Sequence, residues 1–149
     1  MGVDGSERSI NALRWAAGHA AATGSAIDVV TAWEGSVERA VRSTTGVAAA
    51  GAGALSGMHD LDTDLASAAR DTARRCVELA GIDEHHVPVR TWAIRGSGAS
   101  VLLDLVCPGD LLVLGQATHG MVAGALLGSV TARVVCDARC PVVVVPDPD

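Results

Sequence analysis

Short apolar runs of the kind that form buried strands alternate with longer amphipathic stretches along the chain. The runs cover residues 26–33, 87–94, 111–114 and 142–145. Between two of them, Leu65, Ala69 and Cys76 recur at the spacing of one helix face. Parallel strands need long crossover connections, which are usually helices. The alternation therefore predicts an α/β protein in which helices cover both faces of a doubly wound parallel sheet.

Residues that favour helix ends indicate where two of these helices start or stop. Ser6 is expected to cap a helix that stops at Gly24. A second, long helix is expected over 62–79, with Gly81 as its end. Residues 34–60 are rich in Gly, Ala, Ser and Thr, which marks them as the least regular part of the chain.

Length and composition limit the classes of protein to which the chain can belong. Its 149 residues predict a single domain, 1–149, with a substantial core. The formal net charge of −6 argues against nucleic acid as a partner, because such binding depends on clustered Lys and Arg. The sequence contains no run long enough to cross a bilayer and shows no signal-peptide pattern. The four cysteines lack zinc-ligand spacing and are expected to be reduced thiols, so the prediction is a cytoplasmic protein without membrane contacts.

A glycine-rich loop lies between the apolar run 111–114 and a helix expected over 130–135. The loop contains Gly115, Gly120 and Gly128. Glycines let the backbone approach an anion closely, and a helix start supplies unpaired N–H donors at the positive end of its dipole. A strand, such a loop and a helix in this order are typical of phosphate sites in α/β proteins.

Three stretches of the sequence resemble the universal stress protein family. They are Gly-Val-Asp-Gly-Ser at 2–6, the loop that continues to residue 131, and Cys-Pro-Val-Val-Val-Val-Pro at 140–146. The nucleotide-binding loop of that family has the pattern Gly, two residues, Gly, nine residues, Gly, then Ser or Thr. Gly115, Gly128 and Ser129 fit this spacing.

The family pattern opens with an apolar strand that lies in the middle of the sheet. Only Met1, Gly2 and Val3 precede Asp4, which is fewer than the usual strand of about 5–6 residues. The full prediction is therefore a single doubly wound parallel five-stranded sheet with helices on both faces and a first strand truncated at the N-terminus. An apolar run upstream of Met1 is expected to complete that strand in the natural product.

The resemblance also implies a site for ATP, alone or with Mg²⁺. It places Asp4 at the ribose and the backbone of Ala32 at the adenine. The implied contacts to ribose and phosphates come from Gly115, Thr118, Gly120, Gly128, Ser129 and Val130. Asp4, Ala32 and Gly115 also fall at the carboxyl ends of predicted strands, where doubly wound sheets bind their ligands.

Thr118 stands where the family loop has its second glycine, and two interpretations remain open. If this position needs a positive φ, a β-branched residue strains the loop by about 1–3 kcal/mol, and the site shifts or is lost. If φ is negative, the Thr118 hydroxyl becomes a donor to phosphate.

The predicted function is that of a cytoplasmic stress-response protein that binds ATP or a related adenine nucleotide. It would act through ligand-dependent conformation or association. The alternative is a member that has lost nucleotide binding and acts through dimer or partner contacts, and a third hypothesis is a slow nucleotide hydrolase. No activated nucleophile stands out, so an enzyme is not expected. No metal site is expected either, because the cluster Asp60, Asp62 and Asp64 is interpreted as the acidic first turn of a helix. The run 142–145 is expected at a sheet edge, where it would pair with its copy in a homodimer.

Overall fold

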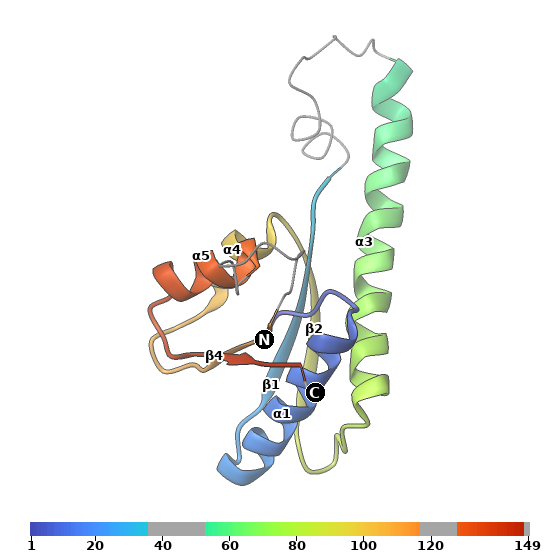
Figure 1. Ribbon diagram of the computed structural model, residues 1–149. Coiled ribbons are helices and arrows are strands. Elements are labelled where there is room, and N and C mark those ends of the chain that lie inside the picture. The colour runs from blue at the N-terminus through green and yellow to red at the C-terminus, as the bar shows by residue number, and fades with distance from the viewer. Residues whose placement is uncertain (36–52, 117–127, 148–149) are drawn as a thin grey trace.

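The alternation of strands and helices predicted from the sequence is confirmed (Figure 1). The computed structural model of the chain describes residues 1–35, 53–116 and 128–147. Its elements follow one another as α1 (Glu7–Thr23), β1 (Ile27–Trp33), α3 (Gly53–Ala80), β2 (Val89–Arg95), α4 (Gly98–Leu105), β3 (Leu112–Gly115), α5 (Ser129–Asp137) and β4 (Val142–Val145).

Helix α1 begins and ends at the residues that the sequence indicates. The Ser6 hydroxyl accepts a hydrogen bond from the Ser9 N–H at 3.2 Å, which satisfies one of the donors of the first turn. At the other end, Gly24 adopts the left-handed conformation with φ 69° and stops the helix. The apolar residues Leu13 and Ala16 lie on the buried face between these two caps.

Helix α3 is longer than predicted, because it begins at Gly53 and not near residue 62. The sequence before residue 62 was interpreted as irregular on account of its small residues. It also contains strong helix formers, among them Ala54 and Leu55, whose propensity extends the helix towards the N-terminus. Asp62 consequently lies within the helix, where its carboxylate pairs with Arg95 at the end of β2, with Oδ2 3.3 Å from Nη1.

The strands form two parallel two-stranded sheets, β1 with β2 and β3 with β4. The expected single five-stranded sheet is therefore not confirmed. The reason is the shortness of the first segment, in which Gly2 forms only an isolated bridge with Val30. An isolated bridge is too short to count as a strand that joins the two sheets.

Residues 1–3 nevertheless connect the two sheets through backbone hydrogen bonds. On one side, Val3 N–H donates to the Val30 carbonyl and Val30 N–H donates to the Met1 carbonyl, both at 2.9 Å. On the other side, Gly2 N–H donates to the Val113 carbonyl of β3 at 3.4 Å. The segment thus occupies the central position expected for the first strand.

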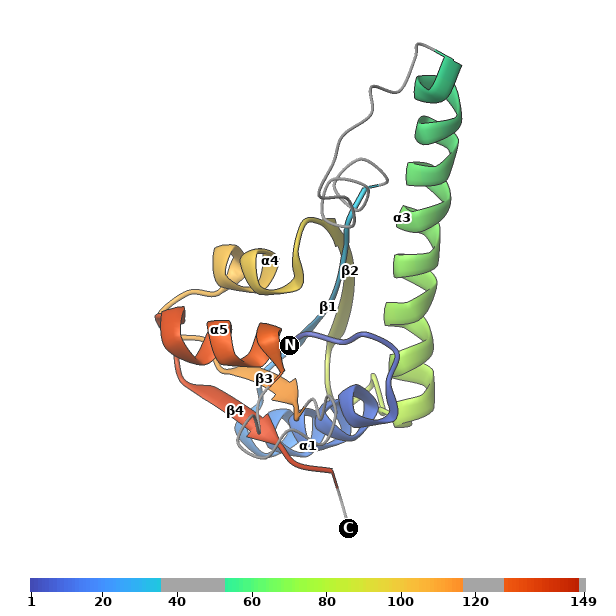
Figure 2. The same ribbon diagram turned by 45° about the horizontal axis from the view of Figure 1, so that its top comes forward.

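Two apolar clusters lie on opposite faces of β1, because side chains alternate along a strand (Figure 2). Ile27 and Val29 pack into the first cluster with residues of α1 and α3. Val30 faces the second cluster, together with residues of α4 and α5 such as Leu102 and Val134. Helices therefore cover both faces, as the doubly wound prediction requires.

The three tryptophans lie in three different surroundings at the surface. Trp15 stacks on His19 with 5.4 Å between ring centroids. The Trp92 indole N–H donates to Asp28 Oδ1 at 2.8 Å. At the end of β1, the guanidinium carbon of Arg95 lies 5.6 Å from the centroid of the Trp33 ring, a cation–π geometry.

Thr31 is a polar residue in the apolar surroundings of β1. Its side chain is buried, and its hydroxyl has no hydrogen-bond partner within the described ranges. A buried hydroxyl without a partner has lost its water contacts and gained nothing in exchange, at a cost of about 1–3 kcal/mol. Thr31 therefore lowers the stability of the folded protein.

Thr31→Val is expected to raise the free energy of unfolding by about 1–2 kcal/mol, because a methyl group replaces the unpartnered hydroxyl. Urea unfolding followed by tryptophan fluorescence measures this change. The matched control is Thr23→Val, since the Thr23 hydroxyl donates to the His19 carbonyl at 2.9 Å and its loss should not stabilise the fold. A destabilised Thr31→Val protein would contradict the assignment.

Candidate ligand-binding site

A cavity of about 240 Å³ opens between the start of α1, the ends of β1 and β3, and the start of α5. Six residues predicted as nucleotide contacts line it, namely Asp4, Ala32, Gly115, Gly128, Ser129 and Val130. The other two, Thr118 and Gly120, lie outside the described residues. The fold thus brings together residues that the sequence separates by more than a hundred positions.

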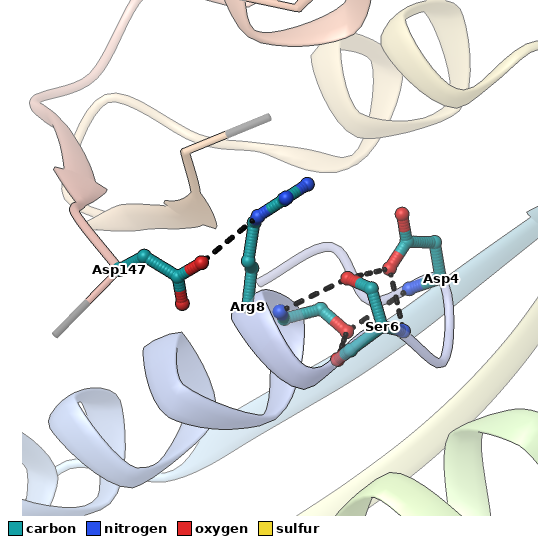
Figure 3. A network of polar contacts seen from close by, with 5 residues as sticks. Asp4, Ser6, Arg8 and Asp147 are labelled. Carbon is teal, nitrogen blue, oxygen red and sulfur yellow. Dashed lines mark hydrogen bonds and ion pairs between the residues drawn. The ribbon is translucent and has the colours of Figure 1, made fainter. Parts of the chain in front are cut away.

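Asp4 is held in place by the serines at the start of α1 (Figure 3). The Ser6 hydroxyl donates to Asp4 Oδ1 at 2.6 Å, and the Ser6 N–H donates to the same oxygen at 3.0 Å. The Asp4 N–H in turn donates to the Ser9 hydroxyl oxygen at 3.5 Å. Asp4 is therefore a fixed group, with its orientation set by the turn that begins the helix.

The same hydrogen bonds determine the charge of Asp4. Partial burial raises the pKa of its carboxyl, but hydrogen bonds from Ser6 and Ser9 lower it by more, so that the pKa lies below its ordinary value. At neutral pH the group is a carboxylate, which accepts hydrogen bonds and donates none. It is suited to hold hydroxyl donors.

Gly115 is required by a close approach of α1 to the end of β3. A Cβ atom at this position would lie 2.7 Å from the Arg8 carbonyl oxygen and 3.1 Å from the Ser9 nitrogen. Both atoms belong to the helix backbone, which cannot move away as a flexible side chain can. The structure thus gives Gly115 a packing role that is independent of any ligand.

The first turn of α5 offers backbone donors to the cavity. Gly128 is its N-cap, is buried and makes no side-chain cap hydrogen bond. The first bond of the helix runs from Ala132 N–H to the Gly128 carbonyl at 2.8 Å. The N–H groups of Ser129, Val130 and Thr131 precede this bond and have no acceptor within the helix. Such groups, at the positive end of a helix dipole, favour an anion.

Apolar side chains form the remaining wall of the cavity. Ala32 comes from the end of β1, and Leu102 and Leu114 belong to the second apolar cluster. Val130 packs closely over the start of α4, since a Cβ at Gly98 would lie 3.3 Å from Val130 Cγ2. The cavity therefore combines an apolar surface with a carboxylate on one side and backbone N–H groups on the other.

Sequence reasoning missed Arg8, which also lines the cavity. Its Nε atom lies 3.1 Å from Oδ2 of Asp147, just beyond β4 (Figure 3). The sequence offers no local signal for Arg8, because Asp4 precedes the N-cap Ser6 and helical spacing does not relate the two residues. Further lining residues that were not predicted as contacts are Gly2, Val3, Ser6, Ser9, Val30, Gly98, Leu102, Leu114, Gln116 and Thr131.

Other kinds of site find no support in the described ranges 1–35, 53–116 and 128–147. They contain no group of three or more His, Cys, Asp or Glu residues arranged to hold a metal ion. Over the same ranges, no helix has the length and apolar character that crossing a membrane demands. The four cysteines are free thiols.

The fold and the cavity define a doubly wound α/β protein with a cavity at the carboxyl ends of its strands, where proteins of this class bind their ligands. Residues 1–146 match the universal stress protein family. This match covers nearly the whole chain, so the protein belongs to the universal stress protein family, and the resemblance drawn from its motifs is confirmed. Among curated proteins, none matches the sequence.

Solved structures share this fold at low sequence identity. The universal stress protein UspA from Lactobacillus plantarum is 20% identical, with a TM-score of 0.71 over 97% of this chain and 93% of that one. The protein MJ0577 is 18% identical, with a TM-score of 0.73 over 99% and 94%. A universal stress protein in complex with cAMP is 23% identical, with a TM-score of 0.64 over 99% and 94%.

Gly115→Ala is expected to destabilise the protein by about 1–3 kcal/mol, because the added methyl group meets the backbone of α1. Thermal unfolding without ligand measures the loss. The control is Gly18→Ala within α1, where a Cβ meets no atom within 4 Å and helix propensity predicts a gain of up to about 1 kcal/mol. Equal unfolding temperatures for the two variants would refute the packing role.

Asp4 is expected to make stability depend on pH in the acid range. Its pKa is lowered by folding, so the carboxylate stabilises the fold above the unfolded value of about 3.9, and this contribution is lost as pH falls through the folded-state pKa. Urea unfolding of the native protein and of Asp4→Asn should therefore show a difference that shrinks from pH 6 to the acid limit. A difference that stays constant over this range would exclude the linkage.

Proposed function

We propose that this protein is a cytoplasmic stress-response protein that binds ATP or a related adenine nucleotide in the cavity beside Asp4. It would act through ligand-dependent conformation or association. The observation that carries the proposal is the convergence of a carboxylate, an apolar wall and an uncapped helix start on one cavity. These three features match the three chemical parts of a nucleotide, which are sugar, base and phosphate.

Each part of the cavity suits one part of such a ligand. Asp4 is an acceptor for the two ribose hydroxyls, since both bonds from Ser6 end on Oδ1 and the second oxygen remains to receive a donor. Ala32 and Leu102 offer an apolar surface to the base. The N–H groups at the start of α5, beside Ser129, face the charge of phosphate.

The structural neighbour in complex with cAMP supports an adenine nucleotide as the ligand class, because it has the same fold. ATP, alone or with Mg²⁺, is the proposed member of that class. The uncapped start of α5 would bind the phosphates through its oriented backbone N–H groups and its partial positive charge.

The cavity gives little support to a hydrolase. Its described lining residues include one carboxylate, Asp4, and no His, Cys, Glu or Lys. A general base works best when its pKa lies near the working pH, and the pKa of Asp4 is lowered. Binding without rapid chemistry is therefore the function proposed.

A homodimer through β4 is the proposed assembly. Within the described chain, β4 pairs with β3 on one side, and its four valines are half-buried. An apolar strand with one unpaired edge can add a strand from a second copy. Val142–Val145 would then be the contact.

Saturating ATP is expected to stabilise the protein, by about 2.7 kcal/mol at one hundred times the dissociation constant. Thermal unfolding with ATP, ADP and AMP measures this effect. Asp4→Asn should reduce it, because a neutral amide holds ribose hydroxyls less well, while Asp71→Asn on the exposed side of α3 should respond as the native protein does. If no nucleotide at millimolar concentration shifts unfolding, the alternative of a member without nucleotide binding is correct.

A further inference from the structure

Arg8 is the one cationic side chain among the described residues that line the cavity. Polyphosphates carry several negative charges, and Asp4 adds another on the same cavity wall. The backbone donors at the start of α5 supply only partial charge. A ligand with a polyphosphate group therefore needs a full positive charge close by, and Arg8 is placed to supply it.

The backbone of Arg8 is fixed beside the site. Its carbonyl oxygen lies against Gly115, where a Cβ atom would come within 2.7 Å. Arg8 is one of the residues that line the cavity, and Figure 3 shows its Nε facing Asp147 while the terminal guanidinium nitrogens extend away from that carboxylate. One edge of the guanidinium is thus engaged by Asp147.

The pair between Arg8 and Asp147 is of the kind that a ligand can displace. The Arg8 and Asp147 side chains are 35% and 49% exposed, and exposed pairs of this type contribute little to stability. Hydrogen bonds between guanidinium and phosphate are charge-assisted and frequently bidentate, so they are stronger. Exchange of a carboxylate for a polyphosphate at Arg8 is therefore favourable.

We infer that Arg8 is the residue that selects polyphosphate ligands in this cavity, and that Asp147 is an internal competitor for it. The inference rests on the proposed function and names the part of the ligand that Arg8 recognises. Nucleosides bind without Arg8, whereas di- and triphosphates compete with Asp147 for the Arg8 guanidinium. The carboxylate of Asp147 also repels an arriving phosphate.

Calorimetric titration with adenosine, ATP and inorganic tripolyphosphate tests the inference on the full chain. Arg8→Gln should weaken ATP and tripolyphosphate binding about tenfold, the value of a charged hydrogen bond, and leave adenosine unchanged. Asp147→Asn should strengthen both about two- to fivefold, because the competitor is removed. In the Arg8→Gln background, Asp147→Asn should have a smaller effect, since the two residues act on one another.

Arg133→Gln is the matched control, because Arg133 also pairs with an aspartate on the surface, Asp137, at 3.6 Å, but does not line the cavity. Its affinity for ATP should equal that of the native protein, and thermal unfolding confirms that each variant is folded. Unchanged ATP binding in Arg8→Gln, or weaker binding in Asp147→Asn, overturns the inference and leaves the proposed function standing.

Failure of the proposed function gives a different pattern. If adenosine and ATP both fail to bind the native protein, the adenine site is absent, and tripolyphosphate alone tests Arg8. Binding of tripolyphosphate that is lost in Arg8→Gln then supports the inference. No binding of tripolyphosphate to the native protein overturns it.

Discussion

Residues 1–3 form backbone hydrogen bonds with both sheets, and the positions of the other elements follow from this link. Val3 bonds to Val30 on one side, and Gly2 bonds to Val113 on the other. If such a bond is broken and its donor or acceptor stays buried without a partner, the fold loses about 1–3 kcal/mol of stability. The same segment also fixes the position of Asp4, which is the next residue in the chain and lines the cavity between the ends of β1 and β3. The stability of the fold and the position of Asp4 at the cavity therefore depend on the same short segment.

Local features of the fold could be predicted from the sequence, and its strand pairing could not. The four valines of β4, bracketed by Pro141 and Pro146, gave the strand its correct bounds, and Ser6 gave the start of α1. The start of α3 was placed too late, because helix propensity over Gly53–Asp60 competed with a composition typical of loops. The division into two sheets depends on hydrogen bonds between distant segments, and no local pattern reports these.

Some residues of the candidate site could likewise be predicted from the sequence, and others could not. Asp4, Ala32 and the start of α5 could be placed because they follow strands or begin a helix, and topology brings such positions together. Arg8 and Asp147 could not, since they are 139 residues apart and meet only in the folded chain. Gly115 was predicted for its part in a loop, and the structure adds a steric reason that concerns α1. A sequence motif can thus identify the right residue, while the packing around that residue gives a second reason why a glycine is needed there.

The surroundings of Trp33 make its intrinsic fluorescence sensitive to the local structure. The chain has no tyrosine, so its near-ultraviolet emission comes from three tryptophans. Trp33 directly follows Ala32 at the cavity, and the Arg95 guanidinium lies over its ring at 5.6 Å. A positive charge at this distance polarises the excited indole. A small displacement of Arg95 or of the end of β1 therefore changes the emission wavelength and the fluorescence quantum yield of Trp33. Movements of Arg95 or of the end of β1 are therefore detectable in unlabelled protein.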